Sequence, residues 1–429
     1  MSRRSSRRPA LRGLVTRFLS ILLGAVVASA LIFSMQLPFL HERPSIHLSL
    51  SSYGSFDYTA PPLAWPSGGS AALDVPALGI IRAWHNHVVP IASLTKMMTV
   101  YVALKRFPLG IGLTGPCVEV TNDDVLNYEA DKSEGDSSVI VTEGEQLCEI
   151  DLLNGVLVHS AANYADMLAA MVSPTPQAFV DRMNDTARSL GLHNTHYADD
   201  TGVSVHSVST ALDQAKLASM LMRSPLVRAI VDQTEVDLPV AGFVNTFTPL
   251  VGANDVVGVK SGRTAEAGGC DVMAVAYRLN GRRHLVYTVV LGQQGGNVLA
   301  TAGDAAYALA ISAEASQADV VLAKGAVLGT IGFGKDVAPF GLARESHVYW
   351  WDQHNDHPLN VRLRHLGDTI HRGEVVGWIE IHSVEKPVPL VALRSAAAPT
   401  LWHLSLIHIW HGHVPSRLRF VARPVVVES

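Results

Sequence analysis

The chain has 429 residues, of which 48% are hydrophobic and 17% are charged, and its formal net charge is −5. This composition is typical of an ordered globular protein long enough for two or three domains. It argues against nucleic acid as a partner, because phosphate binding needs a dense basic face and the chain has no large basic cluster after residue 43.

The N-terminus combines basic residues with a long uncharged segment. Residues 1–17 contain six arginines, and we interpret them as a cytoplasmic basic tail. Residues 18–40 carry no charge. Such a segment is long enough to cross a hydrocarbon core of about 30 Å as a helix. The alternative is a signal peptide cleaved after Ala28-Ser29-Ala30. We expect a single-pass anchor in the cell membrane, because apolar residues continue past Ala30, and either hypothesis makes the rest of the chain extracytoplasmic.

Residues 41–64 are rich in Ser and Pro and predict a linker. Apolar runs at 71–75 and 80–84, separated by a Pro-to-Gly turn, then predict a β-hairpin. The hairpin leads to Ser93-Leu94-Thr95-Lys96, and the apolar run 97–104 that follows predicts a buried helix.

Ser93 and Lys96 are the first candidate catalytic pair. On a helix, residues three apart share a face with Cβ atoms about 5–6 Å apart, so hydroxyl and amine can meet. Burial disfavours the ammonium form of lysine, and a neutral amine can activate a serine. The spacing recurs at Ser383 and Lys386, so it does not identify a site by itself.

The middle of the chain predicts helices and strands in alternation. An acidic loop over 123–136 is expected between strands at 117–120 and 139–141. Helical patterns follow at 150–157 and 164–171, with a break at His159-Ser160 that would display the hydroxyl, and further helices are expected at 179–190 and from Ser209.

Three strands at 256–260, 271–278 and 284–291, and a helix at 299–315, complete the predicted catalytic domain. The fold class predicted is α+β, an antiparallel sheet flanked by helices. Short alternating runs beyond it predict a β-rich C-terminal domain over 318–429.

A second motif, Lys260-Ser261-Gly262, stands at a predicted strand end. An amine beside a hydroxyl can recognise a carboxylate, and glycine leaves room for a substrate backbone. The backbone N–H of the next residue, Arg263, together with that of Ser93, can form an oxyanion hole.

At this point the chain resembles the exported serine D-alanyl-D-alanine carboxypeptidases, the low-molecular-mass penicillin-binding proteins related to β-lactamases. Ser93-Leu94-Thr95-Lys96 is similar to their nucleophile motif, and Lys260-Ser261-Gly262 to their Lys-Thr/Ser-Gly motif. Other matching segments follow in the family's order: Gly144-Glu145, Asp151-Leu152-Leu153, Met183-Asn184, residues 190–195, Ser209-Thr210-Ala211 and Ala267-Gly268-Gly269. The resemblance covers the domain predicted at 65–317 and, more weakly, residues 372–377.

The resemblance implies acyl transfer with no cofactor and no metal. Ser93 would attack the terminal D-Ala-D-Ala bond of a peptidoglycan stem peptide, Lys96 would take its proton, and Ser160 would relay a proton to the leaving group. Lys260, Ser261, Gly262 and Arg263 would bind the substrate. A β-lactam would trap the acyl-enzyme.

The middle motif departs from the family, which has Ser-x-Asn where this chain has Ser160-Ala161-Ala162-Asn163. Ala162 stands where the asparagine belongs, and loss of such a positioning group costs roughly 10²-fold or more in rate. Asn163 is the candidate replacement in substrate binding, although adjacent helical side chains point about 100° apart. Two alternatives therefore stay open: a catalytically weak binder of cell-wall peptide or penicillin, and a D,D-endopeptidase or β-lactamase.

The three cysteines leave one question open. Cys117 and Cys148 could form a disulfide in an exported protein, with Cys270 free, or all three could be unpaired. Gly329 to Lys335 has the spacing of a phosphate loop, but a β-turn is the better interpretation.

Overall fold

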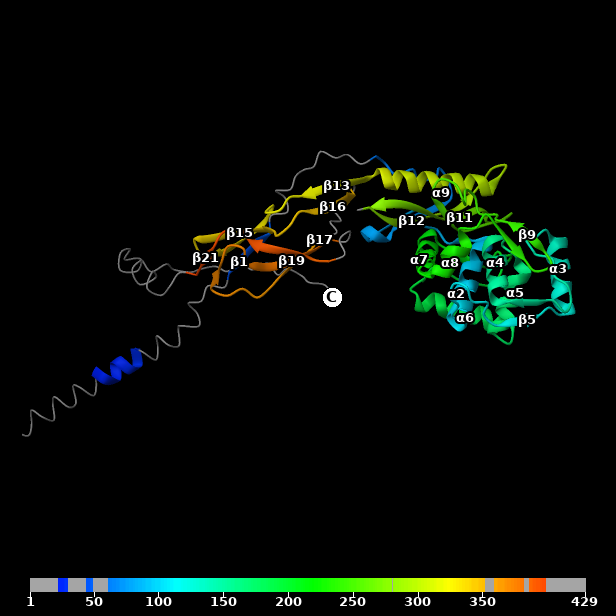
Figure 1. Ribbon diagram of the computed structural model, residues 1–429, viewed down its shortest axis with the longest axis horizontal. Coiled ribbons are helices and arrows are strands. Elements are labelled where there is room, and N and C mark those ends of the chain that lie inside the picture. The colour runs from blue at the N-terminus through cyan, green and yellow to red at the C-terminus, as the bar shows by residue number, and fades with distance from the viewer. Residues whose placement is uncertain are drawn as a thin grey trace, which may run out of the picture.

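The computed structural model describes residues 22–29, 44–48, 61–279, 281–351, 359–381 and 386–398. Figure 1 shows a mixed helical and sheet unit, from which α9 leads by way of β13 into a separate β-rich unit. Most of the segment predicted to be an anchor, 18–40, lies outside these ranges, although residues 22–29 are helical. Within the ranges described, no helix has the length and apolar character that crossing a membrane requires.

The mixed unit is built on a five-stranded sheet in the order β10-β11-β12-β2-β3, with every neighbouring pair antiparallel. Its strands are β2 (Ser70–Val75), β3 (Ile80–Trp84), β10 (Val256–Thr264), β11 (Gly268–Leu279) and β12 (Arg282–Gln293). The predicted hairpin and the three predicted later strands are therefore confirmed, each later strand being longer than its apolar run.

Helices cover both faces of this sheet, because its strands are apolar on both sides. On β11, Met273 and Val275 pack under α9 (Val298–Ala315), whereas Val272 and Ala274 face the other helices. Those helices are α2 (Lys96–Arg106), α4 (Glu149–Val158), α5 (Ala162–Val172), α6 (Pro176–Ser189), α7 (Ala211–Leu221) and α8 (Pro225–Val231). The unit is thus the α+β sandwich predicted from the sequence.

The acidic segment predicted to be a loop is instead a helix, α3 (Asn122–Glu134). Thr121 and Asp124 form a capping box at its start, and Gly135 ends it in a left-handed conformation. Carboxylates in its first turn also suit the positive end of the helix dipole. The strand predicted at 139–141 is wrong as well, because that segment pairs with no neighbouring strand in the described part of the chain.

Three two-stranded ribbons lie around the helices. They are β4 (Val89–Pro90) with β7 (Val208–Ser209), β5 (Cys117–Glu119) with β6 (Gln146–Cys148), and β8 (Glu235–Leu238) with β9 (Gly242–Asn245). Cys117 and Cys148 are directly paired across β5 and β6 and form a disulfide, while Cys270 is a buried free thiol. This answers the question that the cysteine pattern left open.

The β-rich unit is a six-stranded antiparallel sheet in the order β1-β14-β15-β20-β19-β17. Its strands are β1 (Ser45–Leu48), β14 (Val327–Phe333), β15 (Asp336–Leu342), β17 (Leu359–Leu363), β19 (Val375–Ile381) and β20 (Val388–Ala392). Two smaller ribbons accompany it: β13 (Gln317–Leu322) with β16 (Ser346–Trp351), and β18 (Thr369–Ile370) with β21 (Ala396–Ala397).

Four residues of the segment predicted to be a linker, 41–64, instead form a strand, β1. Ser45–Leu48 pairs with β14 at the edge of the C-terminal sheet. Gly329 and Gly332 of β14 make this possible, since a Cβ at either residue would press against the β1 backbone or a Ser45 side-chain atom. These glycines belong to the phosphate-loop-like spacing, which is a strand ending in the turn at Gly334, as the β-turn interpretation predicts.

Candidate active site

Ser93 and Lys96 meet at the start of α2, as their spacing predicts. Ser93 lies in a 3-10 turn, η4 (Ala92–Thr95), and Lys96 is the first residue of α2. The Lys96 Nζ donates to Ser93 Oγ at 3.1 Å and to the carbonyl oxygen of Thr201 at 2.8 Å. The Lys96 side chain is fully buried under the apolar helix, so the turn presents the hydroxyl while the amine stays within the protein.

The backbone is left-handed at two positions beside this chemistry. Ala92, which precedes Ser93, has φ 47°, and Ser160 has φ 64°. Such conformations cost non-glycine residues of order 1–3 kcal/mol and persist only where the surroundings impose them. Gly202 packs directly on the Ala92 carbonyl and helps to hold the turn, since no side chain would fit there.

Ser160 and Lys260 form a second hydroxyl–amine pair. The Lys260 Nζ donates to Ser160 Oγ at 2.9 Å and to the backbone oxygen of Ser261 at 2.7 Å. Ser160 lies at the break between α4 and α5, as the sequence predicts, and Lys260 lies on β10. The Ser261 hydroxyl donates to the Phe247 carbonyl at 2.9 Å.

The structural role of Gly262 differs from the one inferred from the sequence, which was to leave room for a substrate backbone. A Cβ at this position would lie 2.7 Å from the Ser93 backbone nitrogen and 3.2 Å from that of Leu94. The glycine therefore lets β10 pack against the serine's own turn, rather than only making room for a substrate. Arg263 follows on the strand with its side chain exposed.

A cavity of about 110 Å³ opens at these groups. Seven of the eight candidate residues gather around it: Ser93, Ser160, Ser261, Gly262 and Arg263 line it, and Lys96 and Lys260 bond to two of its serines.

Asn163 is the candidate that the structure does not bring to the cavity. Its side-chain oxygen accepts from the Val139 backbone N–H at 3.0 Å, and its amide nitrogen donates to the Val139 carbonyl at 2.7 Å. Asn163 is 2% exposed, and both ends of its amide are occupied by the protein. It therefore does not replace the missing amide at Ala162; it fixes the segment whose Asp136 and Ser137 line the cavity.

Four carboxylates lie near Lys96, and one of them shares a helix with Ala162. Burial lowers the pKa of Lys96 to about 8, and the charges of Asp199, Asp166, Asp200 and Asp136 oppose this effect. Asp166 lies one helical turn after Ala162, on the same face of α5. Its carboxyl is hydrogen-bonded to that of Asp200, and burial raises the pKa of both, as expected for a pair that shares a proton.

Lys260 is more strongly perturbed. Burial lowers its pKa well below the usual range, and the nearby Lys96 adds to this, whereas Asp271 opposes it. Asp271 lies opposite Ser261 in the sheet and is fully buried. Neither of its oxygens has a hydrogen-bond partner, and burial raises its pKa well above the usual range.

Several residues of the site escaped prediction. Asp136, Ser137, Phe247 and Leu299 line the cavity, and Thr201 accepts from Lys96. They belong to loops or element ends without a periodic pattern, so no local signal marks them. Asp271 had one signal, a charged residue at the start of an otherwise apolar strand pattern. Ser383, the accidental match, lies outside the described residues.

The fold and the two serine–lysine pairs define a protein of the penicillin-binding and β-lactamase-like class. The D-alanyl-D-alanine carboxypeptidase family matches residues 80–295, half of the chain, and the chain belongs to this family. The resemblance recognised in the sequence is thereby confirmed.

Individual relatives carry two kinds of name. The chain is 32% identical over 221 residues to the D-alanyl-D-alanine endopeptidase of Escherichia coli, and 33% identical over 196 residues to that of Pseudomonas aeruginosa. These matches cover 48% and 43% of this chain and 66% and 59% of the relatives, so the chain spans less than two thirds of each. It is also 31% identical over 209 residues to the Escherichia coli D-alanyl-D-alanine carboxypeptidase DacC, covering 47% of this chain and 50% of that protein.

Solved structures agree on the fold. Penicillin-binding protein 6B from Escherichia coli aligns with a TM-score of 0.55 at 22% identity, covering 79% of this chain and 98% of the other. The carboxypeptidase DacD from Francisella tularensis aligns with a TM-score of 0.55 at 20% identity, covering 82% and 99%. At these identities the likeness establishes the architecture alone.

Proposed function

We propose that the protein is a serine-type D-Ala-D-Ala carboxypeptidase, which removes the terminal D-alanine of peptidoglycan stem peptides through a Ser93 acyl-enzyme. One observation carries the proposal: the pairs Ser93–Lys96 and Ser160–Lys260 meet at one cavity, with hydroxyl–amine distances of 3.1 and 2.9 Å. A nucleophile with its own base and a second hydroxyl with its own amine suit acyl transfer.

In the first step Lys96 acts as the base. Its neutral amine takes the Ser93 proton while Ser93 Oγ bonds to the scissile carbonyl carbon. The backbone N–H groups of Ser93 and Arg263 stabilise the resulting oxyanion.

The second pair acts on the leaving group. Ser160 gives its hydroxyl proton to the departing D-alanine nitrogen as the C–N bond breaks, and the proton that Lys96 took from Ser93 restores the Ser160 hydroxyl. Lys260 with Ser261 holds the terminal carboxylate. A bound carboxylate favours the charged form of Lys260, and that charge disfavours a charge on Lys96. Substrate binding thus helps to keep the base neutral. Water then hydrolyses the Ser93 ester. When a β-lactam acylates Ser93, the expelled ring nitrogen stays attached to the acyl group and cannot diffuse away, so the adduct remains bound.

Two variants of this function have specific support. The names of the first two relatives favour a D,D-endopeptidase, which would cut cross-links with the same groups. Ala162 favours a weak enzyme that binds penicillin or wall peptide with little turnover. We also propose that residues 18–40 anchor the chain in the cell membrane, or are removed after export, with the catalytic unit outside the cytoplasm, because the substrate is found there.

The test uses the full-length chain purified in mild detergent, with Ser93→Ala as the control. Fluorescent penicillin labelling that depends on Ser93, together with D-alanine release from a peptide ending in D-Ala-D-Ala, supports the carboxypeptidase. Release of fragments only from cross-linked peptides supports the endopeptidase, and labelling without turnover supports the weak binder. A folded sample that takes no label would exclude the serine mechanism.

A further inference from the structure

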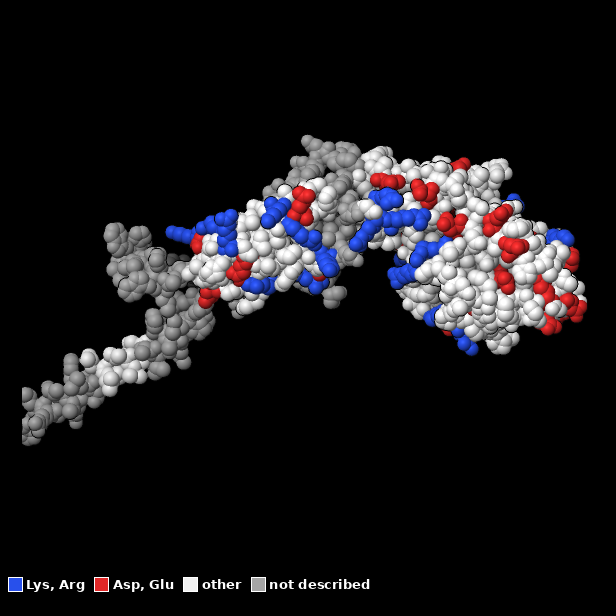
Figure 2. Space-filling model, in the orientation of Figure 1, with Lys and Arg blue, Asp and Glu red and all other residues white. Residues whose placement is uncertain are grey.

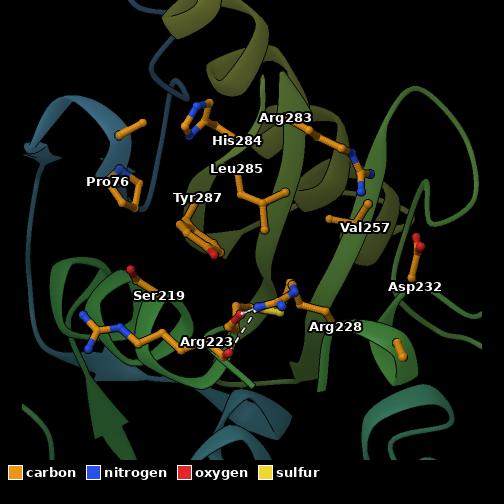
Figure 3. A pocket seen from close by; sticks show the side chains of 13 residues that line it. Pro76, Ser219, Arg223, Arg228, Asp232, Val257, Arg283, His284, Leu285 and Tyr287 are labelled. Carbon is orange, nitrogen blue, oxygen red and sulfur yellow. Dashed lines mark hydrogen bonds between the residues drawn. The ribbon is translucent and has the colours of Figure 1, made fainter. Parts of the chain in front are cut away.

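A second cavity, of about 670 Å³, lies in the mixed unit and shares no lining residue with the candidate active site. Its walls come from the turn after β2, the α7–α8 corner, the start of β10 and the start of β12 (Figure 3). Its volume falls within the range of about 300–1,000 Å³ that small-molecule sites occupy.

Three arginines line this cavity: Arg223, Arg228 and Arg283. In Figure 3, Arg283 extends from β12 beside Val257, whereas Arg228 and Arg223 lie on the opposite side, at the α7–α8 corner. In Figure 2, Lys and Arg atoms lie on the side of the mixed unit that carries α7 and the β11–β12 hairpin, with some Asp and Glu atoms beside them, and further Asp and Glu atoms lie at the opposite end, near α3.

The three arginines keep N–H donors that are available to a ligand. Among the described residues, none of the three takes part in an ion pair. Arg228 Nη1 donates to the carbonyls of Met222 at 2.6 Å and Arg223 at 3.2 Å, which fixes this guanidinium at the end of α7. Its Nε and Nη2 groups have no protein partner in the described part of the chain, so a held fork of donors remains for a ligand.

The lining residues carry a net positive charge, which favours an anion. Among the lining residues, three arginines and one carboxylate, Asp232, leave an excess of two positive charges. Burial and the neighbouring Arg282 lower the pKa of His284, which disfavours a positive charge on this ring. Asp74 does not line the cavity but lies beside it: it is hydrogen-bonded to Ser219, and its charge acts on Tyr287, so it offsets part of this excess. A phosphate monoester carries about −1.5 to −2 charges at pH 7, and guanidinium forks bind its oxygens in pairs.

The remaining walls are apolar or weakly polar. Met222, Val257 and Leu285 supply carbon surface, and the Tyr287 hydroxyl adds a hydrogen-bonding group, whereas the Ser219 hydroxyl already donates to Asp74. We propose that this cavity binds a phosphomonoester attached to an organic group, either a soluble phosphorylated compound or the headgroup of phosphatidic acid, a phospholipid that ends in a phosphomonoester. The proposal does not depend on the carboxypeptidase function, because the two cavities share no residue.

Calorimetry on the full-length chain in non-ionic detergent tests this proposal, with glycerol 3-phosphate as the soluble probe. We expect saturable binding that weakens at least 10-fold in the double variant Arg223→Gln/Arg283→Gln. Both arginines are exposed, and neither belongs to the candidate active site. The matched control, Lys105→Gln/Arg182→Gln, removes two exposed cations elsewhere and should bind like the native chain.

Vesicles of phosphatidic acid, compared with phosphatidylcholine, provide the lipid arm. Any vesicle binding caused by insertion of residues 18–40 is the same in the native chain and the double variant, so the difference between the two reports the cavity alone. Vesicle binding that depends on the two arginines identifies a headgroup as the source, and binding of the soluble probe alone identifies a free compound. Absence of saturable binding by both probes, or equal binding by the native chain and the double variant, overturns the proposal.

A further measurement uses only the native chain, so its result does not depend on whether the variants fold. Phenylglyoxal modifies accessible arginines, and mass spectrometry locates the adducts. The bound phosphomonoester should slow modification of Arg223, Arg228 and Arg283 at least several-fold and leave that of Arg182 unchanged. Equal rates with and without the probe contradict the site. Penicillin labelling of every variant shows separately whether the candidate active site is intact.

Discussion

Gly262 and Ser93 lie so close that a single added carbon on the glycine would come within 2.7 Å of the serine's backbone nitrogen. The strand that carries Lys260 and the turn that carries the nucleophile are therefore in direct backbone contact. Gly262→Ala should push the turn away and slow penicillin acylation by about 10²-fold, because small displacements of reacting groups cost rates of this order.

Gly296→Ala is the control for this substitution, since a Cβ there meets nothing within 4 Å. Stopped-flow acylation and thermal melting should be measured on both variants. Native acylation by Gly262→Ala would mean that the contact does not position Ser93.

Ala162→Asn should raise turnover. The new amide would stand one helical turn before Asp166, on the face directed towards Lys96, and would supply the missing group for the substrate. We expect about a 10²-fold increase in D-alanine release, the scale of a single positioning group. Because Ala162 is buried, the melting temperature must be followed too. An unchanged rate in a stable variant would show that the departure from the family motif is harmless.

Asn163→Ala should lower the free energy of unfolding and leave substrate binding unchanged. It leaves the Val139 N–H and carbonyl unpaired in a buried position, at about 1–3 kcal/mol for each group. Urea unfolding measures the loss, and Gln146→Ala, which removes an exposed amide bonded to Glu119, is the control. A stable variant with weakened substrate binding would instead place Asn163 in the cavity.

Penicillin acylation should rise with pH and level off above about pH 8. The pKa of Lys96 is lowered to about 8, and only its neutral form accepts the Ser93 proton. Below that pKa the neutral fraction, and with it the rate, falls about tenfold per pH unit. The second-order acylation rate between pH 5.5 and 9.5 measures this; a flat profile in a folded enzyme contradicts Lys96 as the base.

Asp271→Asn should stabilise the protein at neutral pH. Burial raises the folded-state pKa of Asp271, so the folded chain keeps a proton that the unfolded chain releases as the pH rises above about 4. Its cost to stability is therefore absent at low pH and grows as the pH rises towards the folded-state pKa. The advantage of the variant in urea unfolding should grow in the same way, by about 1.4 kcal/mol per pH unit at most.

Asp304→Asn, at an exposed position on α9, is the control for Asp271→Asn. Loss of stability at pH 7 in Asp271→Asn would show instead that Asp271 is charged and paired with Lys260.

Local patterns were sufficient for much of the fold. The hairpin 71–84, the three later strands and the buried helix after Lys96 each follow from periodicity within a few residues. Local patterns failed where capping outweighed composition, as in α3, or where the partner of a segment was far away. The residues of Ser45–Leu48 by themselves predict a linker, and pairing with β14, almost 300 residues later, makes the segment a strand.

The sequence by itself determined the family and the residues of both serine–lysine pairs, because motif identity and order are one-dimensional properties. Tertiary structure alone decided that the Asn163 side chain is hydrogen-bonded to Val139 and that Gly262 leaves room for the Ser93 turn. It also decided that carboxylates from α5 and from separate loops lie near Lys96. The physical reason is that burial, contact and charge depend on which distant segments pack together, and no local window of residues contains that information.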